Sequence, residues 1–137
     1  MSKDNAGVDY TAVIQQSGAW WCGWVAEVAG VNAQEKTREQ LIDCLSRALA
    51  EAIEKSADEI ALVAGPDLTA IKAKPLKRFA VVQHLLQNGG ELASESERHS
   101  WWRNKVTKQR ACVPRHGEIA KVIGQKICKD FGIDPLH

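Results

Sequence analysis

Apolar and β-branched residues dominate two short runs near the start of the chain, and each run has the pattern of a β-strand. Residues 10–15 read YTAVIQ, a turn signal QSG follows, and residues 19–28 read AWWCGWVAEV. This succession predicts a hairpin. Side chains alternate between the two faces of a strand, and tryptophan falls on both faces of the second run. We therefore expect that strand to be central or covered on both sides, with a short third strand at residues 31–33.

Apolar residues then recur at helical spacing over residues 37–55. Thr37 and Gln40 form the T-x-x-Q capping pattern that begins many helices. The residues of the apolar face are Leu41, Leu45, Ala48, Leu49, Ala52 and Ile53. The pattern predicts a helix across the sheet, and residues 59–63 predict one more strand, which gives the order β-β-β-α-β. The acidic residues expected on the solvated face of the helix are Asp43, Glu51 and Glu54.

The second half of the chain predicts a different order of elements. An amphipathic helix is expected at residues 76–88, ended by the Asn-Gly-Gly sequence that follows. Three extended segments come next, at residues 91–95, 99–103 and 110–113. A last helix is expected to begin near Gly117 and to end at Gly132. The order α-β-β-β-α is that of the double-stranded-RNA-binding (dsRBD-like) fold, so the whole chain is predicted to be an α+β protein.

The boundary between the halves is expected at GPDLTAIKAKP. Pro66 and Pro75 both oppose the continuation of regular structure, so residues 66–75 are predicted to be a linker. The predicted domains are therefore residues 1–65 and 76–137. Exposed lysines at positions 72 and 74 make the linker an expected site of proteolysis.

Charge is divided between the same two halves. Residues 1–65 hold five basic and ten acidic side chains, a net charge of −5, whereas residues 66–137 hold thirteen and seven, a net charge of +6. A basic segment of this kind indicates contact with nucleic acid, and the acidic segment can compete for the same surface. The sequence therefore predicts a nucleic-acid-binding part joined to its own mask.

The remaining composition limits the alternatives. No apolar run approaches the roughly 18 residues of a membrane span, and the N-terminus lacks the apolar core of a signal peptide, so a cytoplasmic protein without membrane contact is expected. The four cysteines have no zinc-finger spacing. They are expected to be buried, reduced thiols, with neither a metal nor another cofactor.

Cationic residues surround two tryptophans in the predicted second sheet. The candidate RNA-binding residues there are Arg98, Arg103, Lys105, Lys108, Arg110 and Arg115, next to Trp101 and Trp102. Cations can neutralise phosphates while an aromatic ring stacks on an unpaired base. A solvated hairpin with one tryptophan in the core would explain the same pattern equally well.

Two family resemblances lie in the two halves. The sequences VIQQSGAWW, EVAGV and QEKTREQL, within residues 12–52, resemble the antitoxin family HicB. That resemblance implies a degenerate RNase H-like sheet without an active site, used to bind a toxin. The usual DNA-binding segment of the family has no counterpart in this chain, so operator binding is not expected.

Residues 76–133 resemble HicA, the small mRNA-cleaving toxin that HicB inhibits. The resemblance rests on Gly89, on the histidine in SERHSWWR, on VPRHGEI and on KICKDFGI. It implies that His99 is the catalytic residue of an endoribonuclease, an mRNA interferase. Alternation within the strand predicts that His99 shares a face with Trp101 and Arg103.

Metal-free RNA cleavage by attack of the ribose 2′-OH requires a proton-transfer group and a cation near the phosphorane. His99 suits the first task, and the second is open to Arg98, Arg103 or Arg115. His116 is predicted either to contact phosphate near a helix start or to be an ordinary helix-start residue. Glu97 lies two residues before His99, where the family usually has a small residue, and would repel RNA phosphate and raise the pKa of the imidazole.

The leading hypothesis is a toxin–antitoxin fusion whose endoribonuclease part is masked by its inhibitory part. A linker of about ten residues gives a local concentration on the order of millimolar, so docking is expected within one chain, or between two chains in a domain-exchanged homo-oligomer. The alternatives are a non-catalytic RNA-binding module, and an assembly protein that binds no nucleic acid.

Overall fold

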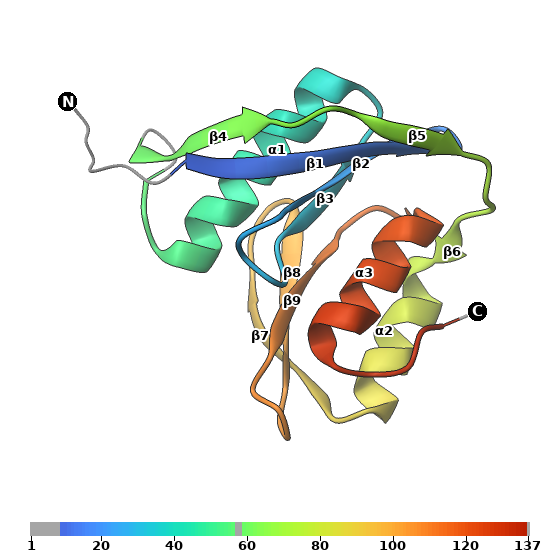
Figure 1. The fold of residues 1–137 in the computed structure, drawn as a ribbon. Helices are drawn as coiled ribbons and strands as arrows, with labels where there is room; N and C mark the ends of the chain where they lie inside the picture. Colours follow the sequence, from blue (N-terminus) through green and yellow to red (C-terminus); the bar gives the residue numbers. More distant parts are fainter. Residues whose placement is uncertain (1–8, 57–58, 137) are drawn as a thin grey trace.

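A computed structural model describes residues 9–56 and 59–136, and Figure 1 shows the path of the chain. The N-terminal half, which we define as the described residues up to Ile71, contains β1 (Asp9–Ser17), β2 (Trp20–Val25), β3 (Asn32–Glu35), α1 (Arg38–Ile53), β4 (Ala61–Ala64) and β5 (Leu68–Ile71). Its sheet has the order β3-β2-β1-β4, with β5 also paired to β1. The predicted hairpin is β1 and β2, which pair in antiparallel fashion. The predicted order β-β-β-α-β is confirmed for β1 to β4.

Helix α1 begins where its capping pattern predicts. Thr37 is the N-cap, and its hydroxyl oxygen accepts a hydrogen bond from the backbone N–H of Gln40 at 3.1 Å. The helix packs its apolar face against β1 and β2, where Ile14 and Val25 are buried with it. The buried residues of that face are Leu41, Cys44, Leu45, Ala48 and Leu49.

The C-terminal half begins with β6 (Leu76–Lys77) and α2 (Arg78–Gln87). An antiparallel sheet of β7 (Gly90–Glu95), β8 (His99–Asn104) and β9 (Arg110–Pro114) follows. The chain ends with β10 (Glu118–Ile119) and α3 (Lys121–Phe131). The predicted helix, three strands and helix are present in that order, with the two-residue strands β6 and β10 in addition, and the α+β class is confirmed. The last helix begins later than predicted, because Glu118 and Ile119 pair with β6 before the helix starts.

The predicted linker is wrong in one respect, since four of its ten residues form β5. This strand runs parallel to β1, with Gln15 opposite Leu68 and Ser17 opposite Ile71. The backbone N–H of Gly18 also donates to the carbonyl of Ile71 at 2.9 Å. Pro66 and Pro75 flank this strand rather than interrupt it, so proline did not mark an unstructured segment. The connection between the halves is shortened to residues 72–75.

The two halves share their apolar cores. One cluster joins α1 and the N-terminal sheet to Trp101 and Cys112 of the C-terminal half. The second cluster joins α2, α3 and the C-terminal sheet to Trp20 and Cys22 of the N-terminal half. The prediction that the strand rich in tryptophan is covered on both sides is therefore confirmed. In Figure 1 the C-terminal half lies beneath the N-terminal sheet, with β3 reaching toward β9.

At Gly30 the backbone of one half lies directly against the other half. The N–H of Cys112 donates to the carbonyl of Gly30 at 2.9 Å, and the N–H of Gly30 donates to Asp130 Oδ2 at 2.9 Å. Gly30 has φ +91, and a Cβ at this position would overlap the carbonyl oxygen of Arg110. Both the backbone conformation and the packing therefore require glycine here.

Three expectations about composition concern the described residues. None of the helices within residues 9–56 and 59–136 is long and apolar enough to cross a membrane. All four cysteines are buried and unpaired with one another, as expected. No group of three or more potential metal ligands gathers in this part of the chain. The expectation about the N-terminus falls on residues 1–8, which lie outside the described residues.

Candidate functional site

The candidate catalytic residue, His99, lies at the start of β8 and is covered by the N-terminal half. Its side chain is 1% exposed. The ring nitrogen Nε2 lies 3.6 Å from Sγ of Cys44, which α1 contributes. Nδ1 is buried without a hydrogen-bond partner among the described residues. The imidazole is therefore present in the predicted strand but is hidden from any strand of RNA.

Burial also affects protonation of this ring. Loss of hydration lowers the pKa of His99, and the nearby carboxylates Glu51 and Glu35 only partly oppose that effect. A neutral imidazole retains one nitrogen that can accept a proton, which is the form that a general base requires. The neutral ring therefore has the protonation state that the predicted role of general base requires. Its buried position, however, keeps it out of contact with RNA.

Strand β8 is buried on both faces, as its alternation suggests. Trp101, two residues from His99, packs into the cluster that contains α1, and its Nε1–H donates to Glu51 Oε1 at 2.8 Å. Trp102 points to the other side, into the cluster of α2 and α3. The prediction that His99 shares a face with Trp101 fits this arrangement. The face of β8 that carries Trp101 packs against α1 of the N-terminal half.

Glu51 differs from its expected role as a merely solvated residue of α1. It remains exposed to solvent, but its carboxylate is the acceptor for Trp101. Arg110 follows the same pattern, since its guanidinium lies 5.0 Å from the centre of the Trp101 ring and donates to the carbonyl of Ala52 at 3.2 Å. This candidate RNA-binding cation is thus occupied by the N-terminal half.

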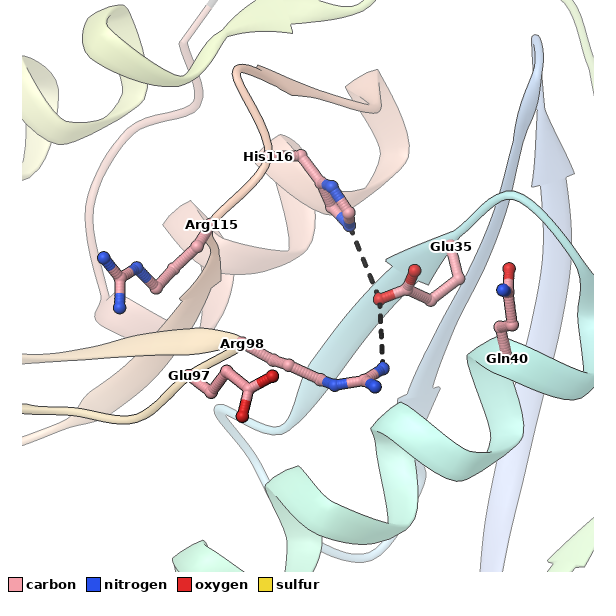
Figure 2. Close-up of a pocket in the computed structure, with 6 residues that line it drawn as sticks. All are labelled: Glu35, Gln40, Glu97, Arg98, Arg115 and His116. Carbon is pink, nitrogen blue, oxygen red and sulfur yellow. Dashed lines mark ion pairs between the residues drawn. The ribbon is translucent and has the colours of Figure 1, made fainter.

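A polar cavity of about 320 Å³ lies between the halves, and Figure 2 shows it. Glu35, at the end of β3, is its centre. Glu35 Oε2 lies 3.9 Å from Arg98 Nη1 and 3.5 Å from His116 Nε2, and Figure 2 shows both side chains pointing at it. His116 Nε2 also lies 2.9 Å from the carbonyl oxygen of Gln34. One carboxylate of the N-terminal half therefore holds two of the candidate RNA-binding residues.

Arg115 also lines this cavity but points away from Glu35 in Figure 2. Its Nη1 donates to the carbonyl of Ser96 at 2.9 Å. Arg103 pairs with Glu91 of β7 at 3.5 Å. Lys105 and Lys108 are exposed in the turn between β8 and β9. The structure thus gathers Arg98, Arg115 and His116 around one cavity and leaves the other candidates elsewhere on the sheet and its hairpin.

The expectation that Glu97 raises the pKa of His99 is wrong, because burial lowers that pKa and the carboxylates that oppose the effect are Glu51 and Glu35. Glu97 lines the cavity of Glu35, and it also lines a smaller adjoining hollow of about 120 Å³ together with Arg98 and His99. Glu95, in contrast, accepts a hydrogen bond from the Ser100 hydroxyl at 2.7 Å. Its pKa is lowered mainly by that bond and secondarily by Arg115. Of Glu95 and Glu97, only Glu97 lines the same hollow as His99.

We call the contact surface between the N-terminal and C-terminal halves the junction. Two residues important for it were not singled out from the sequence. Asn32 and Gln34 of β3 are both fully buried. Asn32 Nδ2 donates to the carbonyl of Cys112 at 2.8 Å, while Gln34 donates to the carbonyl of Glu118 at 3.0 Å and accepts from the N–H of Ala120 at 2.8 Å. Asn32 and Gln34 alternate with Val31 and Ala33, and this carried a signal, since the two polar residues share a face that must meet polar partners.

Searches against protein-family models, curated proteins and solved structures found no match for this chain.

Proposed function

We propose that the chain is a toxin–antitoxin fusion, in which a HicA-like endoribonuclease with a dsRBD-like fold is masked by a HicB-like half with a degenerate RNase H-like fold. One observation carries the proposal. The imidazole that the sequence assigns to catalysis is 1% exposed, and the group against it is Cys44 from the other half. A mask that covers the reacting residue itself is what an inhibitor of this enzyme needs. We place the protein in the cytoplasm, with mRNA as its substrate.

The contact between the halves also engages a cation that cleavage would require. Attack of the 2′-OH creates negative charge on a phosphorane, and a guanidinium near His99 would offset that charge. Arg98 is the neighbour of His99 in sequence and is directed at Glu35. The acidic half therefore competes with phosphate for this cation as well as hiding the base. No metal enters this mechanism.

Shared cores make the mask a lasting one. Withdrawal of the N-terminal half would expose Trp101 and Cys112 on one side and Trp20 and Cys22 on the other. Exposure of this much apolar surface is costly, at roughly 25 cal/mol per Å². The resting chain is accordingly an inhibited enzyme, whether the covering half belongs to the same molecule or to a second, domain-exchanged copy.

A second candidate function is a non-catalytic RNA-binding module. Two observations favour it: the carboxylate of Glu97 adjoins the hollow of His99, and the shared cores resist separation. In that case the accessible cations of the β8–β9 turn would hold RNA, and His99 would be a buried structural residue. An assembly role without nucleic acid is the third candidate.

The test uses the full chain with its cover disturbed at one point. Cys44→Arg places a bulky cation against His99 and is expected to displace α1 locally. The purified wild type, the Cys44→Arg variant and the Cys44→Arg/His99→Ala double variant would each be incubated with mRNA in the presence of a chelator. We expect cleavage by the single variant alone. Equal cleavage by the double variant, or RNA retention without cleavage, contradicts the catalytic role.

A second measurement covers the case in which Cys44→Arg fails to fold. Residues 76–137 would be expressed in cells with and without His99→Ala, and with and without co-expressed residues 1–75. Growth arrest that depends on His99 and is relieved by the N-terminal segment supports the proposal. A soluble segment that leaves growth and mRNA unchanged contradicts it.

A further inference from the structure

A second hollow, which we call the aromatic hollow, lies beside the cavity of Glu35 and is built by both halves. It measures about 600 Å³ and is lined by Trp20, Lys36, Lys77, Phe79, His116, Gly117 and Glu118. Trp20 and Lys36 come from the N-terminal half, and the others come from the C-terminal half. His116 lines both cavities, so they meet at this side chain. The aromatic hollow exists only when the halves are joined.

Phe79 supplies an aromatic ring to the solvent. It is 72% exposed on α2, although most phenylalanine side chains are largely buried. It belongs to neither of the two core clusters. A second ring, that of Trp20, forms a fixed wall, since its Nε1–H donates to Glu118 Oε1 at 3.0 Å and the His116 ring lies 4.7 Å away. The hollow therefore offers one free aromatic face beside a rigid one.

Two lysines give the hollow a positive edge. The Lys36 ammonium lies 3.8 Å from the centre of the Trp20 ring, and both Lys36 and Lys77 are exposed. No ion pair joins either lysine to a carboxylate within residues 9–56 and 59–136. Glu118 is the one carboxylate of the lining, and it is engaged by Trp20. Positive charge thus exceeds negative charge around an exposed ring.

We propose that the aromatic hollow binds a nucleotide, with the base stacked on Phe79 and the phosphate held by Lys36 and Lys77. Every base has a π-face, and stacking on an aromatic side chain combined with cations along the backbone is how proteins hold unpaired nucleotides. The volume falls within the range of small-molecule sites. The ligand is either a free nucleotide or a unit of a single strand. The inference does not depend on cleavage by His99, which lies in a different hollow.

The test measures binding to the full chain by fluorescence anisotropy and by competition. The probes are AMP and a single-stranded 2′-deoxy oligonucleotide of about ten nucleotides, which lacks the 2′-OH that cleavage would use. We expect Phe79→Ala to weaken binding on the order of fivefold or more. Lys36→Gln and Lys77→Gln are each expected to lower the slope of log affinity against log salt by about one. Binding of AMP identifies a free nucleotide as sufficient, and binding of the oligonucleotide alone identifies a strand.

Matched variants separate this site from general attraction. Leu86→Ala removes another exposed apolar side chain of α2, and Lys129→Gln removes a cation that lines a different cavity. Both are expected to bind as the wild type does. Absence of binding for both probes overturns the proposal. So does equal weakening by Lys129→Gln and Lys77→Gln, or tighter binding of an acidic peptide than of either probe.

Discussion

The imidazole Nε2 of His99 lies 3.6 Å from the thiol of Cys44, across the junction between the two halves of the chain. These residues are 55 positions apart in sequence, and they meet because α1 packs over the face of β8 that also carries Trp101. Because of this contact, the solvent exposure of Cys44 indicates the solvent exposure of His99. If the N-terminal half moves away from β8, both the thiol and the imidazole gain solvent together.

Thiol labelling follows directly from this contact. Burial raises the pKa of Cys44 to about 12, so the reactive thiolate is scarce at neutral pH. We expect Cys44 to resist iodoacetamide at pH 8 in the native chain and to react in low concentrations of urea at a rate set by opening of the junction. Peptide mass spectrometry measures the labelled fraction. Rapid labelling of Cys44 in buffer alone contradicts the closed junction.

The pH dependence of stability follows from the lowered pKa of His99. The folded chain keeps this imidazole neutral at pH values where the unfolded chain, with an ordinary pKa of about 6.5, takes up a proton. The unfolded state therefore binds more protons, and stability is present above pH 6.5 and falls as the pH drops from there toward the lower folded pKa. The slope approaches about 1.4 kcal/mol per pH unit for one proton.

Urea unfolding of the wild type and of His99→Gln at a series of pH values measures this contribution. Glutamine does not titrate, so the variant is expected to lose less stability between pH 7 and pH 5 than the wild type does. Identical pH profiles for the two proteins would mean that the ring titrates normally in the folded chain.

Gly30 tests the close packing of the two halves. Gly30→Ala forces an L side chain into φ +91 and directs its Cβ at the carbonyl of Arg110. We expect a loss of roughly 2–4 kcal/mol in the free energy of unfolding, from backbone strain and overlap together. Gly117→Ala is the matched control, since its Cβ would meet open space. Equal melting temperatures for the two variants would refute the close approach of the halves.

Gln34 tests the polar part of the junction. Its side chain is fully buried and bonds to Glu118 and Ala120 of the C-terminal half. Gln34→Ala leaves a backbone N–H and a carbonyl unpaired, and we expect a cost of about 2–4 kcal/mol in chemical denaturation. The exposed Gln125 on α3 provides the same substitution without buried partners, and its effect is expected to be negligible.

Limited proteolysis tests whether a cut chain comes apart. Lys72 and Lys74 are exposed between β5 and β6, and trypsin is expected to cut after Lys72 because Pro75 protects the next lysine. The shared cores should then hold the two fragments together. We expect two bands on a denaturing gel and one peak in native size exclusion. Separate elution of the fragments would show that the covalent connection, rather than the packing, joins the halves.

Local patterns predicted the elements well, and long-range packing decided the site. The capping residue Thr37, the alternation of Trp20 with Trp21 and the segments of the second sheet are each readable from a few neighbouring residues. The covering of His99 is not, because it depends on how a helix from one half docks on a strand of the other. Charge asymmetry indicated a mask, but it could not say which cations Glu35 would engage.

Two misses have particular physical causes. The strand β5 escaped notice because its prolines lie just outside it, where they cost the sheet no hydrogen bond. In the sequence Gly30 is visible only as a break between two extended segments, whereas in the structure its missing side chain leaves room for the backbone of Arg110. Neither role has a signature within its own few residues, since each is set by a neighbour far along the chain.

Each half contributes a tryptophan to the core of the other, Trp20 to the second cluster and Trp101 to the first. This arrangement has a consequence for folding during synthesis. Synthesis proceeds from the N-terminus, so α1 leaves the ribosome well before β8. Until Trp101 is synthesised, the first core is incomplete. The nascent N-terminal half then exposes the apolar surface on which the Trp101 segment will pack. The segment that bears His99 is therefore synthesised after the half that covers it. The His99 ring can be buried as soon as its strand forms, without a stage in which it is exposed to solvent.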